Sequence, residues 1–255
     1  MELIPIHSKI INPNDNLFEA IFKALTEAKI KLQDGDVLTV SSKVVSVTQG
    51  LLINRKEIKV SDKAIEYSKI TKAPPEFMEV SIRESEEVLG ACYGALLTKK
   101  DGLLLPNAGA DQSNAPEGSI VILPHNPIKV AFEIREFLQN KFKCRIGVII
   151  GDSRVQPLRK GTSGIALATA GFIPVIDDRG RIDLFGREMK ITQRAIADNL
   201  MCAAEILSGE VDERVPFVLI RNAPIILTDN DLNYTMSISP EQCMYFGILY
   251  SKKKK

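Results

Sequence analysis

The 255-residue sequence predicts an α+β fold in which mixed sheets are flanked by helices. Short apolar runs rich in β-branched residues, such as residues 146–150 closed by Gly151, are typical of buried strands. Amphipathic segments such as residues 128–142 are typical of helices, and they interleave with the strands without a regular alternation. We therefore expect one unit over residues 1–255, which can divide into two subdomains at a chain crossing or subunit contact near residues 161–171.

Each element follows from a local pattern. A turn at residues 12–16 precedes a helix that Asp15 or Asn16 can cap. The segments 119–123, 128–142 and 146–150 together suggest a strand–helix–strand unit. The predicted strands are residues 2–6, 37–40, 93–98, 102–105, 119–123, 146–150 and 217–221. The predicted helices are residues 17–30, 59–70, 76–89, 128–142 and 192–207, with a further helix start at 239–241.

The composition excludes several classes of protein. The 33 basic and 32 acidic residues nearly balance, whereas a nucleic-acid-binding protein usually carries a basic excess. No apolar run approaches the roughly 18 residues of a membrane span, and the first residues lack a signal-peptide pattern. The four cysteines form no Cys-x-x-Cys pair, which favours buried, reduced thiols in a cytoplasmic protein. The four lysines at 252–255 are expected to form a frayed, solvated tail.

The strongest candidate for chemistry is the stretch 145–161, in which polar residues follow a buried strand. Asp152 and Ser153 stand at the strand end, and Arg154, Arg159 and Lys160 follow. A carboxylate can hold a hard metal ion through oxygen, and the cations can neutralise phosphate. A polar loop with a solvated basic face is an equally good interpretation of this stretch alone. With only two histidines, neither in a catalytic motif, chemistry falls on carboxylates, hydroxyls and cations.

Two other segments carry polar residues in suggestive places. Ser42 and Lys43 follow the strand 37–40, where they could cradle a phosphate, although a polar sheet edge is the favoured interpretation. The loop 106–118 has no strand or helix period, and Asp111 and Asn114 within it offer oxygen ligands and amide donors. No P-loop and no Gly-x-Gly-x-x-Gly is present, so any nucleotide site is not a standard one.

Several segments stand out by their order and spacing: GDVLTVSSKVVS at 35–46, ESEEVL at 84–89, NAGADQSN at 107–114, GVIIGDS at 147–153, RKG at 159–161, GRIDLFGRE at 180–188 and IADNLMCAAEILSGE at 196–210. Together they resemble the coenzyme F-420-0:L-glutamate ligase family. The resemblance covers roughly residues 1–221. It implies a gamma-glutamyl ligase-like fold in an intertwined homodimer, and a GTP-dependent ligase that adds L-glutamate by γ-linkage to the deazaflavin coenzyme F-420-0 through an acyl phosphate. It also implies a divalent metal (Mg²⁺ or Mn²⁺) and potassium.

The resemblance also implies roles for individual residues. Asp111 and Asp152 are the expected catalytic residues, through the metal that they hold. The expected metal ligands are Asp111, Asp152, Ser153 and Glu210. The expected nucleotide or cofactor contacts are Ser42, Lys43, Asn114, Arg159 and Lys160, of which the last two form a basic pair that could face a phosphate.

The chain also departs from the family pattern. Val47 and Asn12 stand where the family has lysines, and Arg154-Val155-Gln156 replaces the end of an Asp-Thr-x-Gly-Arg run. One charged hydrogen bond contributes roughly 1.5–3 kcal/mol, so two missing lysines could weaken GTP binding or change the nucleotide. Two alternatives therefore stand beside the ligase: a diverged paralogue acting on another phosphate-bearing acid, and a non-catalytic deazaflavin- or nucleotide-binding protein.

Overall fold

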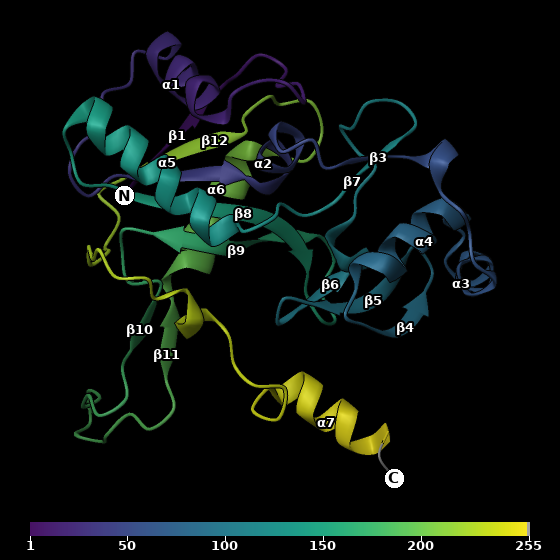
Figure 1. Ribbon diagram of the computed structural model, residues 1–255. Helices are drawn as coiled ribbons and strands as arrows, with labels where there is room; N and C mark the ends of the chain where they lie inside the picture. The colour runs from purple at the N-terminus through teal and green to yellow at the C-terminus, as the bar shows by residue number, and fades with distance from the viewer. Residues whose placement is uncertain (254–255) are drawn as a thin grey trace.

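A five-stranded mixed sheet forms the centre of the computed structural model, which describes residues 1–253, with side-chain exposure described to residue 248 (Figure 1). In spatial order its strands are β1 (Glu2–Ile6), β12 (Phe217–Arg221), β2 (Val37–Ser41), β8 (Gly147–Val155) and β9 (Thr162–Ala170). Only β2 and β8 within this sheet are parallel neighbours, and the other pairs are antiparallel. The predicted α+β class with mixed sheets and flanking helices is confirmed.

Helices cover both faces of this sheet. Helices α1 (Leu17–Glu27) and α5 (Pro127–Phe142) pack on one face, and α6 (Ile196–Ser208) packs on the other (Figure 1). Successive side chains of a strand point to opposite faces. Accordingly, Ile150 joins the core under α1 and α5, whereas Ile149 joins the core under α6. Full burial of each such aliphatic side chain contributes about 1.5–3 kcal/mol, so the two cores fix the position of β8 between them.

A second group of elements lies beside the main sheet and has its own core around Met78, Leu96 and Ile120 (Figure 1). It contains helices α3 (Asp62–Thr71) and α4 (Pro75–Glu84). Its strands form an antiparallel sheet of β4 (Glu87–Cys92), β5 (Ala95–Lys100) and β6 (Leu103–Pro106), and a pair of β3 (Leu52–Asn54) and β7 (Ser119–Val121). The remaining elements are α2 (Ser42–Thr48), η1 (Arg55–Glu57), η2 (Asn107–Gly109), η3 (Asn233–Met236) and α7 (Met244–Lys253).

A hairpin arm projects from the main sheet. Its strands β10 (Val175–Asp177) and β11 (Gln193–Ala195) pair antiparallel, and the loop between them extends away from the rest of the chain (Figure 1). The loop exposes four large apolar side chains, of which Leu184 is 98% exposed. They are Ile182, Leu184, Phe185 and Ile191. Such a concentration of exposed apolar surface is typical of an interaction site.

Several predicted element boundaries are wrong, and the competing interaction is visible in each case. Residues 42–48 form α2 and not a polar sheet edge, because Val45 and Val47 are buried as parts of a helix. Residues 87–89 belong to β4 and not to the preceding helix, since Val88 pairs with Thr98. Residues 193–195 pair with β10, so α6 begins only at Ile196 and not at 192.

The predicted strand–helix–strand unit is also corrected. The strand β7 pairs with β3 outside the main sheet, so it is not a neighbour of β8. The last helix begins at Met244 and not at 239–241, and Lys252 and Lys253 belong to it. Residues 254 and 255 of the expected tail lie outside the described residues. All four cysteines are free, but Cys92 is exposed and the others are half-buried. Among the described residues, no helix is long and apolar enough to cross a membrane.

Candidate functional site

The candidate site is built where β2 and β8 end side by side. Ser41 at the end of β2 is aligned with Gly151 in the parallel strand β8. The next residues along the two strands are Ser42, which begins α2, and Asp152, so parallel pairing brings these two side chains together. The third segment is the loop of Asp111, whose backbone N–H and C=O both hydrogen-bond to Val121 at 2.9 Å. Residues far apart in the sequence are thus held by main-chain pairing.

Lys43 and Asp111 form the charged centre of this site. The Lys43 ammonium lies 2.5 Å from Asp111 Oδ2, and it also donates to the backbone O and Oγ of Ser113 at 3.0 Å each. Asp111 accepts further hydrogen bonds from the backbone N–H groups of Gln112 (2.6 Å) and Ser113 (2.8 Å). Burial alone would raise the pKa of Asp111, but Lys43 and Ser113 outweigh burial and lower it. Asp111 is therefore an anion held in a fixed orientation.

Asp152 has the opposite electrostatic character. Burial raises its pKa to about 6, although the Ser153 backbone N–H, Lys43 and the Ser42 hydroxyl each favour the ionised form, and the Asp111 charge opposes it. The Ser153 N–H donates to Asp152 Oδ1 at 2.9 Å. A carboxylate whose charge is this poorly compensated is one that a cation would stabilise. Lys43, Asp111 and Asp152 thus form one electrostatic unit.

A second acidic pair, Glu205 and Glu210, lies nearby. Only Glu210 is predicted from the sequence. Glu210 follows α6 and accepts a hydrogen bond from Thr162 Oγ1 at 3.1 Å. Burial, together with Glu210, raises the pKa of Glu205 to about 7, and Asp152 adds to this effect. Glu205 Oε1 is buried without a hydrogen-bond partner. Glu205 lies one turn before the end of an amphipathic helix, and nothing local in the sequence distinguishes it from a solvated helix acid.

The other predicted residues are distributed around this centre. Asn114 bridges two loops, because its Nδ2 donates to the backbone O of Val211 at 2.7 Å. Arg159 and Lys160 are exposed in the β8–β9 loop, and their side chains make no ion pair or hydrogen bond within the described part of the chain. Val47, at a family lysine position, is buried in α2 and so cannot contact a nucleotide from there. Asn12 is exposed.

The oxygen donors at the site suit a hard divalent cation, which prefers carboxylate ligands. However, within residues 1–253 no three or more His, Cys, Asp or Glu side chains are gathered as a metal-binding group. Asp111 is instead paired with Lys43, and Glu205 with Glu210. The unpartnered buried oxygen of Glu205 is the feature that fits a cation at this site, since a buried carboxylate oxygen without a donor is costly.

Helix α6 lies unusually close to the two strands that carry the site. A Cβ atom on Gly164 in β9 would lie 2.6 Å from the backbone C and O of Met201. A Cβ atom on Gly151 in β8 would lie 2.2 Å from Met201 Sδ. The small residues at 161–171 therefore allow close approach of a helix of the same chain. This contact holds α6, and with it Glu205, beside Asp152.

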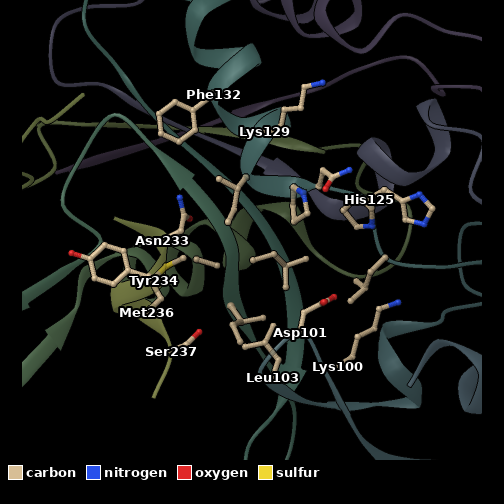
Figure 2. A pocket seen from close by; sticks show the side chains of 18 of the residues that line it. Lys100, Asp101, Leu103, His125, Lys129, Phe132, Asn233, Tyr234, Met236 and Ser237 are labelled. Carbon is tan, nitrogen blue, oxygen red and sulfur yellow. The ribbon is translucent and has the colours of Figure 1, made fainter. Parts of the chain in front are cut away.

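A large cleft of about 1500 Å³ lies next to this centre (Figure 2). Its walls come from α5, β9, the β5–β6 hairpin and the segment around Asn233. Neither Asp111 nor Asp152 lines it, but Arg154, two residues beyond Asp152 on β8, does. This cleft could not be predicted from the sequence, because its walls come from segments separated by up to about 150 residues.

Comparisons with known proteins place the chain in a family. A family model described as F420-0:Gamma-glutamyl ligase matches residues 5–222. A protein of Methanopyrus kandleri named coenzyme F420:L-glutamate ligase is 37% identical over 87% of this chain and 86% of its own length. A protein of the same name from Methanocaldococcus jannaschii is 39% identical over 78% of this chain and 80% of its own length.

A third protein of that name, from Methanococcus maripaludis, is 38% identical over 88% of this chain and 89% of its own length. These matches, together with a carboxylate- and lysine-based site, define an enzyme of the ligase class. The chain belongs to the F420-0:gamma-glutamyl ligase family, which confirms the resemblance stated above.

Proposed function

We propose that this enzyme adds L-glutamate by γ-linkage to coenzyme F-420-0 in a GTP-dependent reaction. The family match and the names of the relatives support the two substrates. The observation that carries the proposal in this chain is the unit of Lys43, Asp111 and Asp152 at the ends of β2 and β8. It offers charges of both signs for phosphate chemistry and uses neither a histidine nor a cysteine.

The proposed reaction has two steps. The carboxylate of F-420-0 attacks the γ-phosphorus of GTP, which forms an acyl phosphate and releases GDP. The glutamate amine then attacks the acyl carbon, forms an amide and displaces phosphate, with loss of a proton from the amine; the amide is a γ-linkage when the activated carboxylate is the γ-carboxylate of a glutamate already attached. Lys43 and the Ser42 hydroxyl contact the transferring phosphate in this proposal, and Asn114 contacts the nucleotide. Arg159 and Lys160 are available in an exposed loop for a phosphate of the substrate.

Asp111, Asp152, Ser153 and Glu210, together with Glu205 beside Glu210, would hold a divalent cation, which would supply charge neutralisation for the phosphates when bound. Before binding, Lys43 neutralises Asp111 at 2.5 Å. If a cation bound to Asp111, Lys43 would no longer be needed to neutralise it. The lysine would then be free to bind a phosphate oxygen. The half-buried position of Asp152 excludes part of the surrounding water, which strengthens these interactions.

The homodimer is part of the same proposal. The β10–β11 arm, with Leu184 and Phe185 exposed at its loop, is the surface that supports an intertwined pair of chains. A second copy that covers these side chains would remove apolar surface from water.

A mass-spectrometric assay tests the proposed function. The purified chain is incubated with F-420-0, L-glutamate, GTP, Mn²⁺ and K⁺, and the expected product is F-420-0 extended by glutamate. Asp152→Asn keeps the shape of the side chain but removes its charge, and is expected to lower the rate at least about a hundredfold. Asp62→Asn, at an exposed position on α3, is the matched control and should retain activity.

The alternatives give different results in the same assay. If the chain binds F-420-0 but forms no product, it is a non-catalytic binding protein. Product with ATP in preference to GTP would indicate a change of nucleotide, the alternative suggested by Val47 and Asn12 at the family lysine positions. Full activity of Asp152→Asn would contradict the assignment of Asp152.

A further inference from the structure

The charges that line the cleft do not favour anions as a whole. Six carboxylates line it and only four permanent cations, so its net charge is negative. Most of these cations are also already neutralised by a nearby carboxylate. The ion pairs are Arg83 with Glu79 at 2.8 Å, Lys100 with Glu84 at 2.6 Å, and Lys129 with Glu133 at 3.6 Å.

Arg154 is the exception among the cations of the cleft. It is half-buried on β8, and it makes no ion pair with any side chain in the described part of the chain. Its hydrogen-bonding neighbour is a neutral amide: with the Gln156 oxygen turned toward it, Nε and Nη2 each donate to that oxygen at 3.2 Å. The guanidinium is thus oriented but its charge is not compensated, which is the condition of an anion-binding arginine before its ligand arrives.

The position of Arg154 connects the cleft to the catalytic centre. Asp152 and Arg154 are two residues apart on one strand, so their side chains lie on the same face about 6–7 Å apart along it. Arg154 lines the cleft, whereas Asp152 lies beside Lys43 and Asp111. An anionic group bound to Arg154 would therefore lie at the end of the cleft that is nearest to the reacting phosphate.

The other side of the cleft suits a flat aromatic ring. Phe132 from α5 and Tyr234 from η3 lie on the side of the cleft opposite Lys100 and His125 (Figure 2). Tyr234 is 75% exposed, and its position in the chain is anchored by its buried neighbour Asn233. The Asn233 Oδ1 accepts from Thr169 N at 2.7 Å, and its Nδ2 donates to Thr169 O at 2.9 Å. The wall that carries Tyr234 is thereby fixed to β9.

We propose that this cleft is the acceptor-substrate site and that Arg154 is its specificity-determining residue. The inference rests on the proposed function, since the acceptor there is a deazaflavin that ends in a phospholactyl group. Its aromatic ring contacts Phe132 and Tyr234, and its acidic end binds Arg154. This binding directs the carboxylate to be activated toward Asp152 and Lys43. The uncompensated charge of Arg154 selects an acidic acceptor over a neutral one.

Paired ligands test this assignment by fluorescence anisotropy of the deazaflavin, which no tryptophan of this chain obscures. One ligand is F-420-0, and the other is the same deazaflavin without its phospholactyl group. Arg154→Gln is expected to weaken binding of F-420-0 about ten- to a hundredfold and to leave the neutral ligand unchanged. Arg154→Lys should restore part of the loss. Tyr234→Leu should weaken both ligands alike, because it removes ring stacking only.

Matched controls lie outside the cleft. Lys69→Gln removes a positive charge from the exposed face of α3, and Tyr93→Leu removes an exposed aromatic ring. Both should bind both ligands as the unaltered chain does. In the glutamylation assay, Arg154→Gln should raise the KM for F-420-0 and leave the KM for GTP unchanged.

The outcomes separate this inference from the proposed function. If the unaltered chain binds and glutamylates F-420-0 but Arg154→Gln binds it equally well, the role of Arg154 is wrong and the proposed function stands. An equal loss of affinity for both ligands would also contradict the role of Arg154, because the affinity would then not depend on the charge of the ligand. If the unaltered chain neither binds nor glutamylates F-420-0, the proposed function and the inference fall together.

Discussion

At the scale of single residues, the sequence predicts the acidic centre better than the contacts that support it. Asp111 and Asp152 follow strand and loop patterns that are visible locally, and the structure brings both to Lys43. Ser113, which anchors Lys43, and Glu205, which faces Glu210, carry no local signal. The hydrogen bond from Asn114 to Val211 joins positions 97 apart, and only the assembled fold determines it.

Glu79 gives a pH-dependent prediction at this scale. Burial by itself would raise its pKa, but hydrogen bonds from Ser61 and Arg83 outweigh burial and hold the pKa below 4.5. A carboxyl with a lowered pKa contributes stability that is present above pH 4.5 and is lost as the pH falls through the lower, folded-state pKa. Glu79→Gln should therefore lower the free energy of unfolding by about 1–3 kcal/mol at neutral pH, and by less in acid.

Urea unfolding at neutral pH and at about pH 3 measures this difference. The exposed residue Glu66 on α3 offers a control, and Glu66→Gln should change stability little at either pH. A loss of stability for Glu79→Gln that is the same at both pH values would show that the ionised carboxylate is not responsible.

At the scale of elements, the errors arise where tertiary packing or strand pairing overrides a local pattern. The valines of residues 44–47 favour extended structure, yet they form α2 because Val45 and Val47 fill space beside the sheet. The strand 217–221 is predicted to the residue, since its apolar run is buried on both faces. Strands with one clear pattern are therefore predictable, and short polar junctions such as the start of α2 are not.

Gly164 gives the prediction for an element. Because Gly164 has no Cβ atom, the α6 backbone lies closer to β9 than an alanine at this position would allow. Gly164→Ala should lower the free energy of unfolding by about 1–3 kcal/mol, because α6 must move away from β9. It should also lower ligase activity, since α6 carries Glu205 beside Asp152.

Thermal unfolding by calorimetry, together with the glutamylation assay, measures both effects. The matched substitution is Gly90→Ala in β4, where nothing lies within 4 Å of the added Cβ atom. Unchanged stability and activity of Gly164→Ala would mean that the helix can shift without cost, contrary to the close contact.

At the scale of the whole molecule, the architecture is predicted as a class but not as a topology. The α+β class follows from the irregular order of elements, whereas the strand order β1-β12-β2-β8-β9 depends on pairing between the two ends of the chain. Leu3 pairs with Ile220, for instance, across more than two hundred residues. Local periodicity contains no information about such pairing, which explains why the two strands of the strand–helix–strand unit predicted over 119–150 lie in different sheets.

The β10–β11 arm gives the prediction for the assembly. Replacement of Leu184 and Phe185 by aspartate should convert the proposed homodimer to a monomer, because charges would be buried at an apolar contact. Size-exclusion chromatography with light scattering measures the mass. Tyr93→Asp alters an equally exposed side chain outside the arm and should leave the dimer intact. A dimer that persists in the arm variant would assign the contact to another surface.

The attachment of the cleft wall by Asn233 has a consequence for how this enzyme can change. The wall around Tyr234 lies beyond residues 5–222, the part that matches the family, and it is tied to the β9 backbone through one side chain. Two of the three hydrogen bonds between Asn233 and Thr169 use main-chain atoms of Thr169, and the third uses its hydroxyl, so the attachment depends on Asn233 and Thr169 and not on residues 234–237. In the proposed acceptor site, substrate range and catalytic chemistry would therefore rest on separate segments, and exchange of residues 234–237 between relatives should alter the choice of acceptor and leave the chemistry unchanged.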